Sequence, residues 1–244
     1  GMLIAPEDGG WQTVAPSALP HLPQEAAPTE LSLADIAQIK ADFVNTARHS
    51  QELGIEAVEL HAAHGYLLSQ FLSPLSNHRQ DAWGGSLENR ARFLLEVVDA
   101  VVTAIGADKV GVRLSPQGVF NDIDDSESTE MALYLAKAFS QRNIAFLHIA
   151  EPDWAGGAPL TPAFRLQLRE AFVGTLMTCG GYNATSAEAL LGANLVDMVA
   201  FGRPFIANPD LVHRLRENAP LNEPDPNTFY GGAETGYTDY PVLS

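Results

Sequence analysis

Short apolar runs alternate with longer amphipathic stretches along most of this chain. Each run has four to six residues and is rich in Val, Ile, Leu, Phe and Met. This pattern is typical of strands that are buried on both faces of a parallel sheet. We therefore predict strands at residues 57–61, 110–115, 146–149, 175–178 and 198–201.

Signals for helix starts and ends stand between these runs. Ser32 with Asp35 predicts the start of a helix over residues 33–53, and Gly54 predicts its end. The next helix is bracketed by Ser86 and Gly106. Further helix starts are predicted at Ser128, at a capping box of Thr185 with Glu188, and at Asn208 followed by Pro209.

This alternation of strands and helices implies βαβ units and a parallel sheet, which places the chain in the α/β class. The 244 residues fit a (β/α)8 barrel of the TIM type, which has about 250. Such a barrel needs eight strands, so the five predicted strands indicate an incomplete barrel. A doubly wound sheet is the alternative, but its glycine-rich turn is absent after residues 57–61.

Three segments follow from this pattern. Residues 1–31 contain five prolines and the pair Gly9-Gly10, which predicts an irregular arm. Residues 32–219 hold the predicted strands and helices of the partial barrel. We expect residues 220–244 to form a C-terminal tail that contributes to the rim of the active site.

The charge balance restricts the partners of the chain. Lys and Arg total 14 against 30 Asp and Glu, and the formal net charge of −16 repels nucleic-acid phosphates and anionic membranes. No apolar run approaches the ~20 residues that span a bilayer, and the single Cys179 cannot form an internal disulfide. We expect a cytoplasmic protein with a small-molecule substrate, and neither nucleic acid nor a membrane as a partner.

Two imidazoles and a phenol follow the first predicted strand. Function in parallel α/β folds sits at the C-terminal ends of strands, where His61, His64 and Tyr66 occur. These groups can donate hydrogen bonds to an oxygen that gains negative charge, and the phenol can release a proton. The alternative is that they are structural residues with satisfied partners. A metal site formed with His148 is disfavoured, because neither a carboxylate nor a cysteine stands at ligand spacing; we predict no metal.

Arg113 places a guanidinium inside the apolar run 110–115. A buried charge is unfavourable unless it is paired with an anion or an electron-rich ring. One interpretation is therefore that Arg113 binds a ligand. The other is a structural salt bridge to a carboxylate of the barrel, such as Glu59 or Glu151.

Glycine turns follow the last two predicted strands. Gly180 and Gly181 come after the run 175–178, and Gly202 with Arg203 comes after the run 198–201. Barrels commonly bind phosphate at this place through loop amides and a helix N-terminus, so the pattern favours a cofactor that carries phosphate. Cys179 has no identifiable base beside it in the sequence, and we expect it to be a small packing residue.

Several of these motifs together resemble one known family, the Old Yellow Enzymes, which are NADH:flavin oxidoreductases. The similarity is greatest to the bacterial branch of N-ethylmaleimide, xenobiotic and pentaerythritol tetranitrate reductases, and it covers nearly the whole chain. The motifs are VELHAAHGYLL at 58–68, QFLSP at 70–74, WGGSLENR at 83–90, GVRLSP at 111–116, AFGR at 200–203 and FYGG at 229–232.

The resemblance implies an FMN-dependent reductase of activated alkenes or nitro compounds that uses NAD(P)H. By resemblance, His61 and His64 bind the carbonyl or nitro oxygen, and Tyr66 delivers the proton. Arg113 lies against the flavin ring, and Tyr230 borders the substrate pocket. The FMN phosphate is held by Gly180, Gly181, Gly202 and Arg203.

The chain departs from the family pattern at its start. The first three strands of the family's barrel, with their flavin contacts, have no counterpart in this sequence, so the chain corresponds to the portion with the fourth to the eighth strand. We therefore expect weak or absent FMN binding, and self-association through the exposed edge strands at Val58 and Val199. The alternative function is a truncated, non-catalytic barrel fragment.

Overall fold

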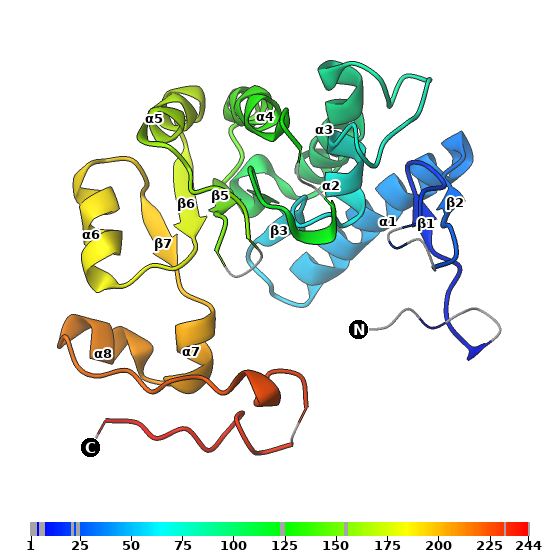
Figure 1. Ribbon diagram of the computed structural model, residues 1–244. Coiled ribbons are helices and arrows are strands. Elements are labelled where there is room, and N and C mark those ends of the chain that lie inside the picture. Colours follow the sequence, from blue (N-terminus) through cyan, green and yellow to red (C-terminus); the bar gives the residue numbers. More distant parts are fainter. Residues whose placement is uncertain are drawn as a thin grey trace.

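Five parallel strands form one sheet in the computed structural model, which describes residues 4, 8–20, 22, 25–122, 125–153, 156–231 and 233–243. The strands lie side by side in sequence order, from β3 to β7 (Figure 1). They are β3 (Val58–His61), β4 (Val110–Leu114), β5 (Phe146–Ala150), β6 (Thr175–Cys179) and β7 (Met198–Ala200). A doubly wound sheet would reverse its strand order at a switch point. The prediction of an incomplete (β/α)8 barrel with five strands is therefore confirmed.

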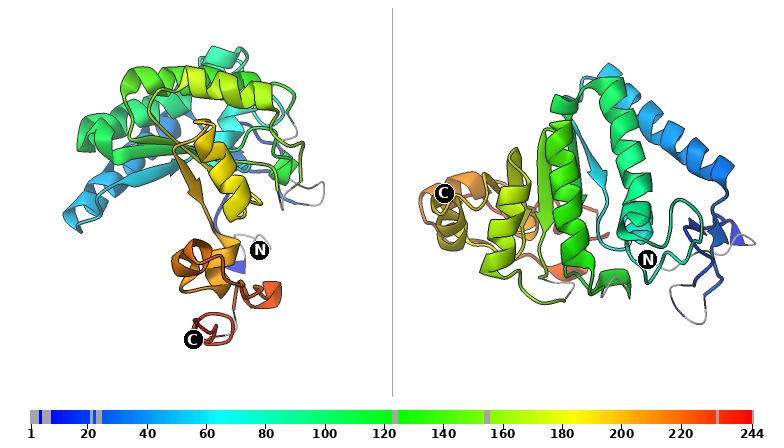
Figure 2. Two further views of the ribbon diagram at one scale, coloured as in Figure 1. Left: turned by 90° about the vertical axis from the view of Figure 1, so that its left-hand side faces the viewer. Right: turned by 90° about the horizontal axis from the view of Figure 1, so that it is seen from above.

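Helices follow the strands and cover one face of this sheet. Seen from above, α3, α4 and α5 lie next to one another over the sheet (Figure 2). The longer helices are α1 (Leu33–Glu52), α3 (Leu87–Ile105), α4 (Ser128–Arg142), α5 (Pro162–Ala171) and α6 (Ala184–Gly192). The shorter ones are α2 (Leu67–Leu72), α7 (Arg203–Ala207) and α8 (Leu211–Arg216), with 3-10 turns η2 (Ala107–Lys109), η3 (Phe120–Asp122) and η4 (Pro226–Thr228). None of the helices in the described ranges has the length and apolar composition that a bilayer span requires.

Local capping signals placed the first helices correctly. Ser32 and Asp35 form a capping box at the start of α1. Ser86 caps α3 by accepting a hydrogen bond from Asn89 N, and the helix ends before Gly106, whose φ is 97°. Ser128 is the first residue of α4 rather than its cap, so this helix starts one position earlier than predicted.

The predicted starts of the last two helices were wrong. Asn183, not Thr185, caps α6, because its side chain accepts a hydrogen bond from Ser186 N at 2.9 Å. Asn208 does not cap α8, which begins at Leu211. The buried Asn208 amide instead donates to Pro204 O at 2.7 Å and accepts from Asn222 N at 2.8 Å, so it joins α7 to the C-terminal segment.

The two faces of the sheet differ in burial. Leu60, Val112, Leu147 and Leu176 are neighbours in the strand register and form one buried apolar row on the face that the helices cover. The opposite face carries polar residues: Leu60 is the one buried residue of β3, β6 alternates between buried and partly exposed positions, and no residue of β7 is buried. Burial on both faces, as predicted, is therefore wrong for these three strands, because no second layer covers that face in the described part of the chain.

Arg79 anchors the N-terminal arm to the barrel. Its guanidinium is 5% exposed and donates to Pro16 O at 3.1 Å and to Leu31 O at 2.7 Å, while it also pairs with Asp81. The arm contains the two-residue strands β1 (Val14–Ala15) and β2 (Thr29–Glu30), which pair in parallel. Residues 1–3, 5–7, 21, 23 and 24 of the predicted arm lie outside the described residues.

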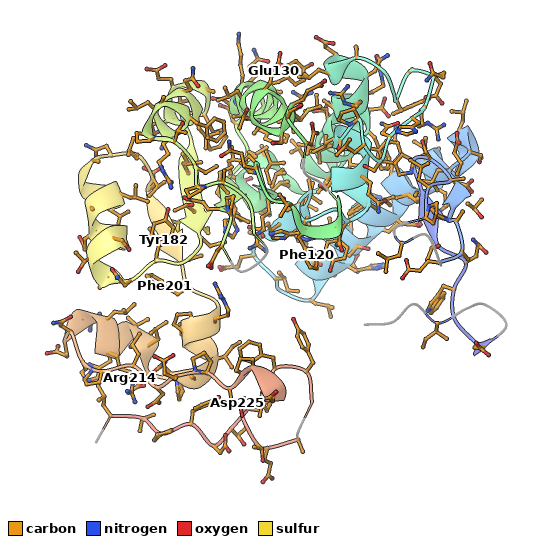
Figure 3. All side chains as sticks on the ribbon, in the orientation of Figure 1. Phe120, Glu130, Tyr182, Phe201, Arg214 and Asp225 are labelled. Carbon is orange, nitrogen blue, oxygen red and sulfur yellow. The ribbon has the colours of Figure 1, made fainter. Side chains whose placement is uncertain are left out.

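Arg214 has the same role for the C-terminal segment, which lies with α7 and α8 below α6 and β7 (Figures 1 and 3). Its guanidinium is almost fully buried and donates to Asp210 Oδ1, Pro220 O and Pro241 O, each within 2.8 Å. Because arginine offers several donors in a rigid planar fork, one side chain satisfies carbonyls from separate chain segments.

Candidate functional site

The structure brings the rings of His61, His64 and Tyr66 together at the C-terminal end of β3. The ring centroids are 5.7 Å apart for His61 and His64, and 5.3 Å apart for His61 and Tyr66. A tight turn produces this arrangement, in which Tyr66 N donates to Ala63 O at 3.3 Å. The two central residues, His64 and Gly65, have φ of 58° and 72°. The turn therefore folds the second histidine and the phenol back beside the first histidine.

Both histidines are biased toward the neutral form. Burial, together with the positive charge of Arg113, lowers the pKa of His61. The same causes, with His61 as a further neighbour, lower the pKa of His64 to about 4. A neutral imidazole carries one N–H donor and one acceptor nitrogen. At neutral pH these two rings can thus donate to an oxygen without adding a cation to the site.

Arg113 faces the same side of the sheet as His61, since the two residues are register partners on β4 and β3. Its Nη2 donates to Cys179 Sγ at 3.2 Å, and its buried Nε has no hydrogen-bond partner in the described part of the chain. The alternative of a salt bridge to Glu151 is wrong, because Glu151 pairs with Arg165. Glu59 pairs with His148 instead: burial opposes its charged form, but His148, with Arg113 as a lesser cause, lowers the pKa of Glu59.

A chain of polar side chains that sequence reasoning missed crosses this face of the sheet. His148 Nδ1 lies 2.8 Å from Glu59 Oε2. Burial opposes the charged form of His148, but the neighbouring Cys179 and Glu59 outweigh it and raise its pKa. Burial likewise opposes the thiolate of Cys179, yet His148 and Arg113 lower the pKa of the thiol. The expectation that Cys179 has no base beside it is therefore wrong, since His148 comes from a neighbouring strand.

Gly111 on β4 leaves room for an aromatic ring from the neighbouring strand. It lies between Glu59 and Phe146 in the strand register. A Cβ at Gly111 would come within 2.2 Å of the Phe146 ring, which occupies the space that a side chain would need. The glycine in the motif GVRLSP is thus explained by the close approach of an aromatic ring.

The two predicted glycine turns come together around Asp153. Cys179 pairs with Ala200 in the register, so Gly180-Gly181 and Gly202-Arg203 follow neighbouring strand ends. Asp153 reaches both turns, because it forms an ion pair with Arg203 and its Oδ1 would lie 3.4 Å from a Cβ at Gly181. A Cβ at Gly202 would meet no atom within 4 Å. The sequence did not single out Asp153, which follows β5.

A buried carboxylate, Glu151, lies at the end of β5 next to the Gly180-Gly181 turn. Its side chain is 8% exposed and pairs with Arg165. Its Oε1 accepts hydrogen bonds from Thr178 Oγ1 and Tyr182 OH, each at 2.5 Å. Burial and Glu151 raise the pKa of Tyr182 to about 12, so the phenol remains a donor. The network joins the ends of β5 and β6 to the residue that follows Gly181.

A pocket of about 570 Å³ opens beside Tyr66. Its walls come from the N-terminal arm, including Leu19, and from Phe120 and Asn121 after β4. Tyr230 does not line it, since its side chain is fully exposed on the C-terminal segment. Its place at the substrate pocket stays a prediction. Among the described residues, no group of three His, Cys, Asp or Glu side chains is placed to hold a metal ion.

The sequence matches the NADH:flavin oxidoreductase / NADH oxidase family over residues 6–222. A putative 12-oxophytodienoate reductase of Oryza sativa subsp. japonica is 43% identical over 221 residues, which are 89% of this chain and 60% of the relative. A probable flavin mononucleotide-dependent alkene reductase of Leishmania infantum is 39% identical over 250 residues, covering 97% of this chain and 68% of the relative. The chain thus spans about 60% of the length of the plant relative.

The chain is also similar to solved structures of a reductase. Morphinone reductase superposes with a TM-score of 0.91 at 47% identity, over 96% of this chain and 67% of that protein. Its complex with tetrahydroNAD superposes with a TM-score of 0.90 at 46% identity, over 97% of this chain and 68% of that protein. An identity above a third over nearly the whole chain supports a common fold and a common arrangement of strand ends.

Proposed function

The chain belongs to the NADH:flavin oxidoreductase / NADH oxidase family, and we propose that it forms the substrate-binding and phosphate-binding part of an FMN-dependent NAD(P)H oxidoreductase. The reaction is the reduction of activated alkenes, such as enones, or of nitro compounds. The resemblance to Old Yellow Enzymes in the sequence is confirmed at the level of the family. The assignment to its xenobiotic-reductase branch and the cytoplasmic location stay proposals.

One observation carries the proposal. The cluster of His61, His64 and Tyr66 lies next to Arg113, and Arg113 Nη2 contacts Cys179, the residue before Gly180. A candidate oxyanion site and a candidate phosphate site are therefore connected along one edge of the sheet. Such an arrangement fits a cofactor with a reactive ring at one end and a phosphate at the other.

The residues present fit FMN. Arg113 Nε is buried without a hydrogen-bond partner in the described residues, which leaves a donor for a ring oxygen or nitrogen. Gly202 leaves open space beside Arg203. The phosphate would be held by Gly180, Gly181, Gly202 and Arg203, and Arg203 would leave its ion pair with Asp153 to pair with the phosphate. Bound FMN would supply the hydride that reduces the substrate.

The side chains of the chain perform the remaining steps. The imidazole N–H groups of His61 and His64 donate hydrogen bonds to the carbonyl or nitro oxygen, which stabilises the negative charge that develops there. Their lowered pKa values keep them neutral at pH 7. The Tyr66 hydroxyl then donates a proton to the substrate carbon. The pocket beside Tyr66 would give the substrate access to the phenol.

The relatives support both the reductant and the substrate class. The name of the Leishmania relative describes a flavin mononucleotide-dependent alkene reductase. A structure of morphinone reductase contains tetrahydroNAD. We therefore propose NAD(P)H as the reductant for this protein and a small molecule with an activated double bond as its substrate.

Flavin binding tests the cofactor assignment. We expect the fluorescence of added FMN to be quenched when it binds to the chain. FMN should bind more tightly than riboflavin, because only FMN offers a phosphate to the glycine turns. Arg113→Leu should weaken FMN binding by about 10- to 100-fold, the effect of losing a hydrogen bond to a charged donor. Arg142→Leu is the matched control, since Arg142 pairs with Asp99 on the surface. Equal affinity for FMN and riboflavin would contradict the phosphate site.

The open edges of the sheet carry the second proposal. In the described residues, β3 and β7 are the outermost strands, and Met198 on β7 is 49% exposed. Unpaired edges favour pairing with another chain. We propose that the isolated chain self-associates through them, and that it holds FMN more weakly than a complete barrel would. The expected result in sedimentation velocity is a sedimentation coefficient that rises with protein concentration; a monomer at all concentrations would contradict it.

A further inference from the structure

The turn that carries His64 has an unfavourable backbone conformation. His64 has a φ of 58°, a left-handed value that residues with a Cβ rarely adopt. The next residue, Gly65, has a φ of 72°. Backbone conformations of this kind persist only where the surrounding structure supports them. Groups that bind this turn therefore control the place of the His64 ring.

Three side chains from three different elements bind the backbone of the turn. Ser115, directly after β4, accepts a hydrogen bond from His64 N at 2.8 Å. Ser69 on α2 accepts one from Gly65 N at 3.3 Å. Asn121 in η3 donates to His64 O at 2.8 Å. Each bond involves the main chain of the turn, so together they hold its backbone from three sides.

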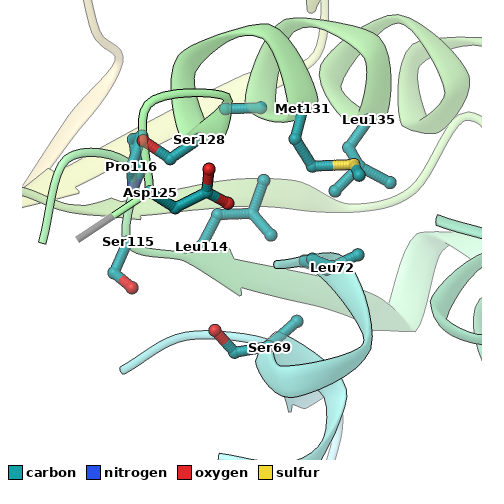
Figure 4. Close-up of a pocket in the computed structure, with 11 residues that line it drawn as sticks. Ser69, Leu72, Leu114, Ser115, Pro116, Asp125, Ser128, Met131 and Leu135 are labelled. Atoms are coloured by element: carbon teal, nitrogen blue, oxygen red, sulfur yellow. The ribbon is translucent and has the colours of Figure 1, made fainter. Parts of the chain in front are cut away.

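The two serines line a small pocket behind the turn (Figure 4). Their hydroxyl oxygens point toward each other at one end of it, and Leu114 and Met131 form its apolar wall. The volume is about 50 Å³. A space of this size holds about one or two water molecules and no organic substrate. The serines are thus placed to hold the backbone rather than to bind substrate.

From this geometry we infer that Ser115 is a positioning residue, which with Ser69 fixes the His64–Gly65 turn and so holds the His64 ring beside His61 and Tyr66. This inference rests on the proposed function for its effect on catalysis. Of the two serines, Ser115 makes the shorter bond, to the residue with the unfavourable φ. Without its hydroxyl, the N–H of His64 loses an acceptor, and the turn can relax toward ordinary backbone angles.

The test compares Ser115→Ala with two matched variants. Ser115→Thr keeps the hydroxyl and should behave like the wild type. Ser128→Ala removes a hydroxyl from the same pocket, one that accepts a hydrogen bond from Gln117 N at 3.2 Å and does not touch the turn. Amide hydrogen exchange and the titration of His64, assigned by its loss in His64→Gln, are followed by NMR in the full chain without FMN.

In Ser115→Ala we expect the His64 and Gly65 amides to exchange about 10- to 100-fold faster. The His64 imidazole, whose pKa is lowered to about 4 in the intact site chiefly by burial and then by Arg113, should titrate closer to the ordinary value of about 6.5 as the ring becomes more exposed and moves away from Arg113. If the proposed activity is present, kcat should also fall by about 10-fold or more, because misplaced groups lose alignment.

Each outcome separates the inference from the proposed function. Unchanged exchange and titration in Ser115→Ala would overturn the positioning role, whatever the activity. The same changes in Ser128→Ala, or no recovery in Ser115→Thr, would show that filling the pocket matters rather than the hydrogen bond, and would also overturn it. Failure to bind FMN in the wild type would contradict the proposed function alone, since the NMR measurements do not need the cofactor.

Discussion

In the proposed reaction, replacement of Tyr66 by phenylalanine is expected to slow the reduction of an activated alkene by roughly 10²- to 10⁴-fold, the range for loss of a general acid. The ring stays in place, so its packing against His61 at 5.3 Å is kept. Only the proton donor is removed. In single-turnover measurements, the consumption of NAD(P)H should keep its rate, and the step with the alkene should slow.

Tyr134→Phe is the control for this substitution, because Tyr134 packs against the hydrophobic core on α4. The Tyr134→Phe variant should leave the consumption of NAD(P)H and the alkene step unchanged.

The pH dependence is set in part by His64. Since the pKa of His64 is lowered to about 4, its ring is neutral from pH 6 to 8 and becomes charged only as the pH falls toward 4. We therefore expect no change of rate from this histidine near neutral pH. An alkene step of normal rate in Tyr66→Phe would exclude Tyr66 as the proton donor.

Replacement of Glu151 by glutamine is expected to lower the free energy of unfolding by about 3–5 kcal/mol, the range for removing one partner of a buried ion pair. The carboxylate is 8% exposed and satisfies Arg165, Thr178 and Tyr182 together. An amide would leave the guanidinium of Arg165 without a counter-charge and would point N–H groups at hydrogen-bond donors. Because domains are stable by about 5–15 kcal/mol, this loss is large.

Urea unfolding gives the measurement, with a lower midpoint at an unchanged slope as the expected result. Glu96→Gln is the matched control, since Glu96 pairs with Lys40 at 3.0 Å but is 32% exposed. That variant should lose less than about 1 kcal/mol, as exposed pairs do. Equal midpoints for the two variants would mean that the Glu151 network does not stabilise the fold.

Predictions from the sequence were correct where the signal is local. The apolar runs located all five strands of the sheet, and Ser32 with Asp35 placed the start of α1. The predicted helix starts were wrong where two local signals compete within a few residues, or where a distant segment engages the predicted cap. Asn183 and Thr185 are both good helix caps, and the structure uses Asn183 because its side chain reaches Ser186 N. Asn208 has the right type for a cap, but contacts with the C-terminal segment engage its side chain.

For the candidate site, the sequence predicted the residues on the strand ends but not their partners. His61, His64 and Tyr66 stand within six residues, so their proximity follows from one turn. The pairing of Glu59 with His148 joins residues 89 positions apart. Asp153 and Glu151 likewise reach the glycine turns from a different strand. No pattern along the chain indicates which of these carboxylates faces which cation.

By itself, the sequence determined the kind of element at each place along the chain and the chemical groups at the strand ends. These depend on backbone preferences and on hydrophobic period, which act over a few residues. Only the tertiary structure decided that Arg113 contacts Cys179, that Ser115 supports His64, and that one face of the sheet is partly exposed. These contacts depend on strand register and on what covers each face, and both result from packing between distant segments.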